Sequence, residues 1–441
     1  MNAIEFDHKP QINVSVLDVI FFYYVLLIGS ATPLLTNLDV RVNPVGVAMY
    51  FTALLSLISF TKLPLLNNGV KIVLSVVLGW FAVHYFIDPD FKYLQHGIYF
   101  IHIVTGYFIV RVYGNTILLR FERCVTLLAI ISLLMWVVEL HEGIPFMQSH
   151  APFKNTWENG GSYLIFNIQP VDYIGAYAGS IIRNSGFAWE PGRFASILVL
   201  AYACNVIRMH GKINYFSKRR IIFVCALVTT FSTTGLIALL LVMALNIVFS
   251  KEVKPSSKIV LAVVFSIAIA GILKLPYMSE KISTRADEST YMSNDEERLA
   301  LIEEGDEQFT VDRFEGLMLD GLNLAQTPWV GYGLNAENSY VQQEISQNLV
   351  TSNDIVKPMA MFGVPLTLLF FIVCFLGLKR ITREYGYNFG PLLFITLMTI
   401  SVSYRWMDTP IMFALAYYSV FSYEHDDREH IHIHRNRLLQ Q

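Results

Sequence analysis

The run IIFVCALVTTFSTTGLIALLLVMALNIVF (residues 221–249) decides how this chain is threaded. A membrane-spanning helix needs about 20 apolar residues, and at a rise of about 1.5 Å per residue this run is too long for one untilted crossing. Short segments rich in Lys and Arg mark the cytoplasmic side of a membrane, and such segments lie on both sides of the run. We therefore predict a hairpin of two short helices over residues 221–250, with its turn near TTFSTTG (229–235). The flanking basic residues are Arg208, Lys212, Lys218, Arg219 and Arg220 before the run and Lys251, Lys254 and Lys258 after it.

Composition places the chain among polytopic membrane proteins. Of its 441 residues, 54% are hydrophobic and only 15% are charged, whereas soluble domains average about 25% charged residues. The 14% of aromatic residues is typical of a bundle with wide aromatic belts at the membrane interface. The composition predicts an all-α membrane helical bundle surrounded by the lipid bilayer, and it gives no indication of a nucleic acid partner.

The apolar segments predict about twelve transmembrane helices within a single integral membrane domain, residues 1–441. Besides the hairpin, the predicted spans are 12–31, 45–61, 70–87, 94–111, 123–140, 193–209, 258–275, 357–378, 388–404 and 409–423. Arg120 and Arg123 fit this topology, because they then lie on the cytoplasmic side. Both termini, with the polar tail 424–441, are therefore predicted to be cytoplasmic.

Two large polar loops, 141–192 and 276–356, are then predicted on the outer side of the membrane. The second loop carries sixteen acidic and four basic residues. The spans hold few ionisable groups, with Asp18, His84 and His102 as examples, and the simplest interpretation of each is a polar group satisfied by a neighbour. A carrier or channel usually shows more such residues at mid-membrane depth. The distribution therefore favours chemistry at the outer face.

The first loop ends in RNSGFAWEPGRF, where charged residues meet the start of a predicted span. Pro191 suits the first turn of that helix, because its missing N–H would have no partner there, and Glu190 then falls near the N-cap. A helix start suits an anion, and Arg183 and Arg193 add two guanidinium groups that suit phosphate oxygens. Trp189 fits an interfacial aromatic belt. The residues alone leave two interpretations open: an anion site, or an ordinary helix entry with Glu190 capping and the arginines reaching lipid headgroups.

The second loop opens with an acidic stretch, SNDEERLALIEEGDEQF (293–309), for which a solvated helical face is the simpler interpretation. Val311, Phe314, Met318 and Leu322 then follow a helical period. This period predicts an amphipathic helix along the outer membrane surface.

The segment after this helix combines tight turns with a polar cluster. Thr327-Pro328 ends the helix, Gly331 and Gly333 bracket a turn, and a further helix toward the tenth span starts near Glu337. Glycine turns of this kind permit close backbone approach, so we interpret this segment as a candidate functional segment rather than a solvated loop.

Three short motifs in this topology resemble the superfamily of bacterial O-antigen polymerases and O-antigen ligases. They are R-x-x-G-F-x-x-E-P from Arg183 to Pro191, the T-x-S hairpin LVTTFSTTGLIAL (227–239), and Arg313 followed by a P-x-x-G-x-G turn (Pro328 to Gly333) and the N-x-Y pair Asn338 and Tyr340. Each motif is short, and the resemblance rests on their common order and spacing over roughly residues 120 to 420.

The resemblance implies a C-type glycosyltransferase-like enzyme of the bacterial inner membrane, with both large loops in the periplasm. The donor would be a growing glycan on undecaprenyl pyrophosphate, and the acceptor would be the sugar end of a new lipid-linked repeat unit. Arg183 and Arg313 would hold the pyrophosphate and stabilise its charge as it leaves. Such an enzyme inverts the anomeric centre and is expected to need no metal, nucleotide sugar or other cofactor. The substrate-binding residues would be Arg193, Asn338, Tyr340 and Trp189.

One position departs from the pattern of the superfamily. Its ligases tend to carry a His just before the N-x-Y pair, where this chain has Glu337. The difference favours a repeat-unit polymerase for O-antigen, capsule or exopolysaccharide over a ligase that transfers finished glycan to an acceptor. Glu190 or Glu337 would take the acceptor proton.

Two other classes are alternatives. A transporter, such as a flippase for the same lipid-linked units, predicts a polar path through the bundle and symmetry between the halves of the chain, and the sequence indicates neither. A membrane acyltransferase would need a His deep among the helices, where His84 and His102 are the candidates. For the polymerase we expect undecaprenyl-pyrophosphate-linked oligosaccharides, a chain-length regulator and a flippase as partners.

The four cysteines lie in apolar segments, so neither zinc nor a disulfide framework is predicted.

Overall fold

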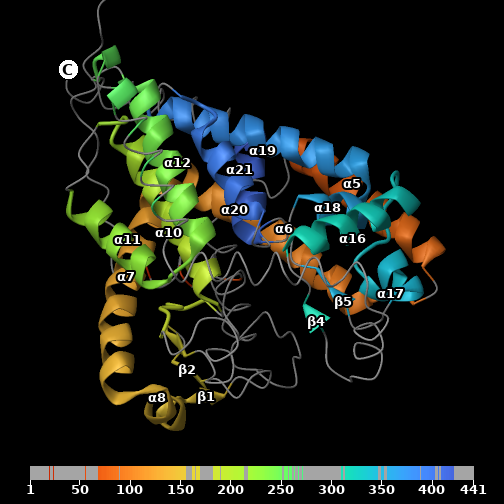
Figure 1. Ribbon diagram of the computed structural model, residues 1–441. Coiled ribbons are helices and arrows are strands. Elements are labelled where there is room, and N and C mark those ends of the chain that lie inside the picture. The colour runs from red at the N-terminus through yellow and green to blue at the C-terminus, as the bar shows by residue number, and fades with distance from the viewer. Residues whose placement is uncertain are drawn as a thin grey trace, which may run out of the picture.

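The computed structural model describes a large part of the chain between residues 68 and 421 (Figure 1). The described residues are 19, 23, 55, 68–88, 90–154, 161–163, 165–168, 182–188, 190–212, 217–250, 253–256, 258–260, 263, 267, 271, 309–310, 313–345, 349–351, 355–387, 389–402, 406 and 409–421. The predicted spans 12–31 and 45–61 lie almost entirely outside these residues, and 258–275 lies largely outside them.

The described part of the chain is mainly helical. Its longer helices are α5 (Asn68–Ile87), α6 (Tyr93–Tyr113), α7 (Ile117–Glu142), α10 (Pro191–Arg208), α11 (Lys218–Thr229), α12 (Thr233–Phe249), α16 (Arg313–Gln326), α19 (Val364–Glu384), α20 (Leu392–Ser401) and α21 (Pro410–Phe421). The shorter ones are η2 (Gly114–Thr116), α8 (Ile144–His150), η3 (Ala336–Asn338), α17 (Tyr340–Glu344) and α18 (Val356–Phe362). Figure 1 shows α7, α10, α11 and α12 on one side and α5, α16, α17 and α18 on the other, with α6, α20 and α21 between them.

Two small sheets accompany the helices. β1 (Phe153–Lys154), β2 (Gly161–Ser162) and β3 (Asn167–Ile168) are antiparallel in that order, with Phe153 opposite Ser162 and Gly161 opposite Ile168. β4 (Phe309–Thr310) and β5 (Leu349–Val350) are parallel, with Phe309 opposite Leu349. The first sheet belongs to the first polar loop and the second sheet to the second.

Helix α10 is the centre of the bundle. Every residue from Pro191 to Ile207 is buried, and α10 packs against α7, α11, α12 and α20. Small residues permit these close approaches. A Cβ added at Gly235 of α12, for example, would lie 2.7 Å from the Cβ of Ala195. The start of α10 is therefore held by protein on all sides.

Glycines also lie where α21 crosses its neighbours. A Cβ added at Gly377 of α19 would lie 2.2 Å from the carbonyl oxygen of Leu415. One added at Gly106 of α6 would lie 2.5 Å from the Cβ of Phe413. Backbone contact of this kind is typical of helices packed in membranes, where small residues replace the hydrophobic driving force available in water.

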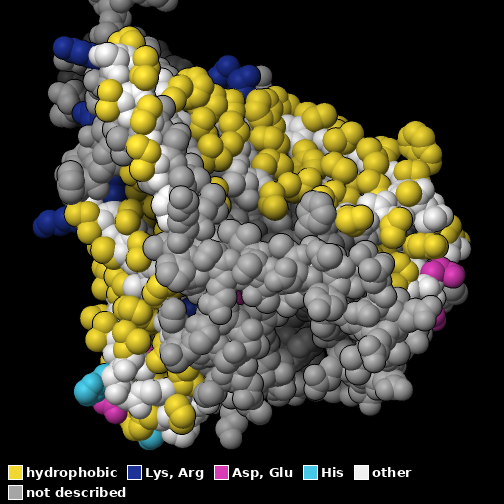
Figure 2. Space-filling view, in the orientation of Figure 1, with side chains coloured by type: hydrophobic (Ala, Val, Ile, Leu, Met, Phe, Trp, Pro, Cys, Tyr) yellow, Lys and Arg dark blue, Asp and Glu magenta, His cyan; other side chains and the backbone are white. Residues whose placement is uncertain are grey.

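Three described helices are long and apolar enough to cross a membrane: Val70–Ile87 within α5, then α7 and α19. Their outward side chains are apolar and exposed, as Leu134 (63%) and Ile372 (56%) illustrate. Figure 2 shows hydrophobic side chains covering the exposed faces of α7, α12 and α19. An apolar exposed surface of this extent is suited to lipid rather than water, so the chain is a membrane protein.

A charged cluster ties α7, α10 and α11 together at one end of the bundle. The fully buried carboxylate of Glu122 accepts hydrogen bonds from Arg208 Nε (2.5 Å), Arg219 Nη1 (2.6 Å) and Asn205 Nδ2 (2.9 Å). Arg220 is buried as well and donates from Nε to Asn205 Oδ1 (2.8 Å). A buried charge is tolerable when it is paired and hydrogen-bonded in this way.

The segment predicted as the tenth span, 357–378, is divided between two helices. α18 ends at Phe362 and α19 begins at Val364, and Gly363 between them has φ +79°. A Cβ there would lie 2.2 Å from the carbonyl oxygen of Trp329. Glycine at the end of α18 and Pro365 in the first turn of α19 are local signals for this break, and the carbonyl oxygen of Trp329 fills the space that a side chain at position 363 would need.

Candidate functional site

The first-loop segment that follows Ile182 is hydrogen-bonded to the turn between α11 and α12. Arg183 Nε donates to the carbonyl oxygen of Thr230 (3.0 Å). The backbone N–H of Asn184 donates to the carbonyl oxygen of Thr229 (2.9 Å), and its Nδ2 donates to Thr229 Oγ1 (2.9 Å) and to Ser132 Oγ (3.3 Å). Two of the three sequence motifs, R-x-x-G-F and T-x-S, therefore form one structural unit.

Gly186 gives this unit its sharp bend. Its φ is +54°, and its N–H donates to Asn184 Oδ1 (2.9 Å). A Cβ at this position would lie 2.7 Å from the ring of Phe194, which packs edge-on against Phe187 at 5.8 Å. Only glycine combines a left-handed backbone with this close contact.

Helix α10 begins at Pro191, as the sequence predicts, and Glu190 is its N-cap in an extended conformation (φ −141°, ψ 152°). The Glu190 side chain is half-buried and accepts no hydrogen bond from the N–H groups of the first turn of α10. This finding is contrary to the interpretation in which Glu190 caps the helix. Arg193 is only 8% exposed, so it does not lie on the lipid-facing surface. Trp189 is outside the described residues.

One face of α7 lies along the same loop segment. Ser132 contacts Asn184, and one turn further on Trp136 Nε1 donates to the carbonyl oxygen of Ile182 (3.0 Å). The next residue on this face is Glu139, which is 1% exposed. Within the part of the chain that the structure describes, its Oε2 has no hydrogen-bond partner.

Sequence analysis missed Glu139, because a carboxylate near the end of an apolar helix resembles an ordinary helix terminus. The signal that could have found it is its spacing. Residues 132, 136 and 139 share one helical face, and that face meets the loop carrying Arg183. Beyond it, α8 and the β1–β3 sheet cover the helix end, where Tyr163 Oη donates to the carbonyl oxygen of Met147 (2.9 Å). Burial raises the pKa of this Tyr163 phenol.

In the second polar loop, the two-glycine turn packs against the break between α18 and α19. Tyr332 N–H donates to the carbonyl oxygen of Ala360 (2.9 Å), and Gly333 N–H donates to that of Met361 (3.0 Å). Gly331 and Gly333 have φ of +79° and +88°, and a Cβ at Gly331 would lie 2.2 Å from Met361 O. The glycines therefore permit backbone contact between two segments of the chain.

The same turn touches α5. His84 is buried, its Nε2 donates to the carbonyl oxygen of Val330 (3.3 Å), and its ring packs on Trp80 at 4.2 Å. This contact supports the interpretation of His84 as a helix-end polar group satisfied by a neighbour. The neighbour is a loop from a distant part of the chain rather than an adjacent helix.

Helix α16 combines a buried polar side with an exposed apolar side. Asp320 Oδ1 accepts from Thr351 Oγ1 (2.8 Å), and Asn323 Oδ1 accepts from the N–H of Val341 (2.9 Å). On the opposite side Met318 and Leu322 are 62% and 46% exposed. Helix α16 is therefore amphipathic, as predicted. Val311 and the side chain of Phe314 lie outside the described residues.

The remaining predicted residues lie around η3. Glu337 Oε2 pairs with Lys92 Nζ at 3.1 Å, with the two side chains 66% and 39% exposed. Asn338 is half-buried, and Tyr340, the first residue of α17, is 37% exposed. Arg313 is the first residue of α16, and its side chain is outside the described residues, so the predicted convergence of Arg183 and Arg313 stays a prediction.

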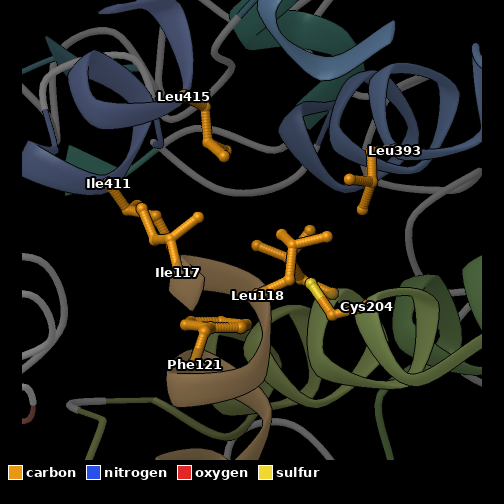
Figure 3. A pocket seen from close by; sticks show the side chains of 8 residues that line it. Ile117, Leu118, Phe121, Cys204, Leu393, Ile411 and Leu415 are labelled. Carbon is orange, nitrogen blue, oxygen red and sulfur yellow. The ribbon is translucent and has the colours of Figure 1, made fainter. Parts of the chain in front are cut away.

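A small cavity between α7, α10, α20 and α21 is entirely apolar. Figure 3 shows side chains from these helices pointing toward it. It is lined by Ile117, Leu118, Phe121, Leu200, Cys204, Leu393, Ile411 and Leu415. With no polar group on its wall it is a packing gap and has no chemistry to offer.

Comparison of the chain with protein families, with curated proteins and with solved structures finds no match. Any functional conclusion therefore depends on the motifs and on the geometry described above.

Proposed function

We propose that the chain is a polymerase that joins undecaprenyl-pyrophosphate-linked oligosaccharide units into a surface polysaccharide. In this proposal it works at the outer face of the bacterial inner membrane. The observation that carries the proposal is the bonding of Arg183 and Asn184 to the Thr229–Thr230 turn beside the buried start of α10. A guanidinium anchored to a rigid backbone and adjacent to a helix N-terminus is suited to a diphosphate.

The proposed reaction moves the glycan from one lipid to another. A hydroxyl of the acceptor sugar attacks the anomeric carbon of the donor, the bond from that carbon to the pyrophosphate oxygen breaks, and the configuration inverts. The hydroxyl proton passes to a carboxylate, Glu190 or Glu337, and the negative charge that develops on the departing pyrophosphate is stabilised by Arg183 and Arg313. The leaving group is already attached to the donor lipid, so the reaction needs no nucleotide sugar.

The other predicted residues have supporting roles in this proposal. Arg193 adds positive charge at the start of α10, while Asn338, Tyr340 and Trp189 contact the sugars. Tyr340 and Asn338 have the partial exposure that sugar contact requires.

The test uses a bacterial strain that lacks its own copy of the gene and is complemented with variants. Arg183→Ala and Arg183→Lys should abolish long glycan chains on a gel, because lysine lacks the planar fork of two donors, while membrane blots show normal insertion. Arg383→Ala, which alters an exposed arginine of α19, is the matched control and should leave chain length unchanged. Normal chain length in Arg183→Ala would reject this site.

The attachment of the product separates the polymerase from the ligase. Purified lipid-linked repeat units incubated with the protein should give longer glycans that still end in undecaprenyl pyrophosphate. Glycan transferred to a lipid A core or to a protein would instead identify a ligase, and movement of unchanged units across vesicles would identify a flippase.

A further inference from the structure

Three buried polar side chains gather where α5 ends, α6 begins and η3 starts. Asp88 follows α5, His96 lies in the first turns of α6, and Asn335 is the N-cap of η3. They are 7%, 2% and 2% exposed, respectively. None of them belongs to the residues to which the proposed reaction assigns a role.

Two contacts hold Asn335 against the α5–α6 segment. On one side, a Cβ at Gly333 would lie 2.9 Å from His84 Nδ1, four residues before Asp88. On the other side, Glu337 pairs with Lys92 at 3.1 Å, four residues before His96. The chain from Gly333 to Glu337, with Asn335 at its middle, therefore lies along the segment that carries Asp88 and His96.

In each of the three side chains, one polar atom forms a hydrogen bond with a backbone group nearby in the sequence, and the second polar atom does not. Asp88 Oδ1 accepts from the N–H of Asp90 (2.9 Å), which leaves Oδ2. Asn335 Oδ1 accepts from the N–H of Glu337 (3.3 Å), which leaves Nδ2. His96 Nδ1 lies 2.9 Å from the carbonyl oxygen of Lys92, which can only accept, so Nδ1 carries a hydrogen and Nε2 of the neutral ring carries a lone pair.

The three remaining atoms, Asp88 Oδ2, His96 Nε2 and Asn335 Nδ2, are buried and have no hydrogen-bond partner among the described residues. Proteins rarely bury polar atoms in this state without a water or ligand to satisfy them. Two of the atoms are acceptors and one is a donor. Asp88, His84 and His96 do not converge as metal ligands in the part of the chain that is described.

Aromatic rings lie around His96, one member of this polar group. The ring of His96 stacks on Phe91 at 3.9 Å and meets Phe81 edge-on at 5.0 Å, and Trp80 lies 6.1 Å away. A few polar groups within aromatic walls are typical of a small-molecule site. A pyranose sugar offers the matching chemistry, because its hydroxyls both donate and accept while its C–H faces are apolar.

We propose that Asp88, His96 and Asn335 form the subsite for the hydroxyl groups of the acceptor sugar. His96 Nε2 and Asp88 Oδ2 accept hydrogen bonds from sugar hydroxyls, and Asn335 Nδ2 donates one. The exposed ion pair between Lys92 and Glu337 joins the two segments that carry the subsite, and exposed pairs of this kind are weak enough to open for a ligand. This inference rests on the proposed polymerase function and names where its acceptor binds.

The test measures sugar binding without any donor lipid. Purified full-length protein in detergent is titrated with a panel of methyl glycosides (hexosides, N-acetylhexosaminides and 6-deoxyhexosides) and observed by saturation-transfer NMR. We expect at least one glycoside to bind. Its Kd should rise at least tenfold in Asp88→Asn and in Asn335→Asp, because each change reverses one hydrogen-bonding group while keeping the side-chain shape.

Matched controls are available nearby. Asp90→Asn changes an exposed aspartate two residues from Asp88, and Gln343→Glu adds a carboxylate at an exposed position of α17; both should bind the glycoside like wild type. A second measurement needs no variant: the same glycoside carrying a diazirine is photo-crosslinked to the wild-type protein, and labelled peptides are mapped by mass spectrometry. Labels should fall within 80–96 or 331–340.

The outcomes separate this subsite from the proposed reaction. Absence of glycoside binding, unchanged affinity in both variants, or labels elsewhere would each overturn the subsite, even if Arg183→Ala still abolishes polymerisation. Glycoside binding with the expected variant effects would support the subsite even if Arg183→Ala kept its long chains, in which case only the proposed pyrophosphate site would fail.

Discussion

A glutamate is buried near each end of α7, and the two carboxylates differ in their hydrogen-bond partners. Near the start of the helix, Glu122 is fully buried and contacted by Arg208, Arg219 and Asn205. Near its end, Glu139 is 1% exposed, and its Oε2 has no hydrogen-bond partner among the described residues. A carboxylate with several partners is a fixed structural link, whereas one without them is costly unless it has another use.

The contrast between a carboxylate with several partners and one with an unpartnered oxygen extends to other parts of the bundle. In the Glu122 cluster, both carboxylate oxygens accept hydrogen bonds from protein donors, and these bonds join three helices. Glu139, beside the loop of Arg183, and Asp88, His96 and Asn335, beside the two-glycine turn, are among the buried side chains with a polar atom that has no hydrogen-bond partner among the described residues. We expect the paired and the unpaired carboxylates to respond differently to substitution, and four tests address that difference.

The largest effect on stability is expected at Glu122, near the start of α7. Glu122→Ala removes the common partner of Arg208 and Arg219, and we expect it to lower the free energy of unfolding by about 3 kcal/mol. The measurement is thermal unfolding of the detergent-solubilised protein, followed by intrinsic fluorescence. Glu142→Ala, at an exposed position of the same helix, should change the unfolding temperature little. Equal stability of the two variants would mean that the cluster is not a structural link.

A second test compares two glycines of the second loop: one has backbone atoms where a Cβ would lie, and the other has open space there. Gly331 has φ +79° with Met361 O in the way of a Cβ, while Gly321 in α16 has nothing within 4 Å. Gly331→Ala should cost about 2 kcal/mol of unfolding free energy, whereas Gly321→Ala should gain about 0.5 kcal/mol because alanine favours a helix. Similar effects of both changes on the unfolding temperature would contradict the packing of the turn.

Asn184 links the first-loop segment to both α7 and the α11–α12 turn, so we expect its loss to lower both stability and function. Asn184→Ala removes donors to Thr229 Oγ1 and Ser132 Oγ and should cost about 2 kcal/mol. We also expect shortened glycan chains, because Arg183 loses its neighbour's anchor. Gln343→Ala, at an exposed position of α17, is the control. Full-length glycans from Asn184→Ala would indicate that Arg183 needs no such anchoring.

The smallest effect on the free energy of unfolding is expected at Glu139, near the end of α7, and it has the opposite sign. Glu139→Leu replaces a buried carboxylate by an apolar side chain of similar size and should stabilise the protein by about 1 kcal/mol. Glu139→Gln should leave the unfolding temperature nearly unchanged. A fall of several degrees in either variant would mean that the carboxylate has a stabilising partner in the folded protein.

The sequence predicted those features that depend on local chemistry. Helices α5, α6 and α10 correspond closely in their bounds to the apolar segments 70–87, 94–111 and 193–209. The start of α10 at Pro191 follows from the missing N–H of proline.

Features that depend on distant parts of the chain could not be predicted. The close approach of the Trp329 carbonyl oxygen to Gly363, and the hydrogen bond from His84 to the carbonyl oxygen of Val330, 246 residues away, each join separate segments of the chain. Periodicity cannot identify such partners. For the same reason the sequence identified the glycine turn but not Asp88 or His96, whose burial depends on tertiary packing at the α5–α6 junction.

The enclosure of α10 has a consequence for the environment of the protein. Bilayers differ in thickness, and helices in contact with lipid respond by tilting. Because α10 is buried along its length and packs against α7, α11, α12 and α20, that adjustment falls on outer helices such as α5 and α19. We expect the geometry between Pro191 and Thr230 to stay constant from thin to thick membranes, so the pyrophosphate end of the proposed reaction would be insulated from changes in lipid composition.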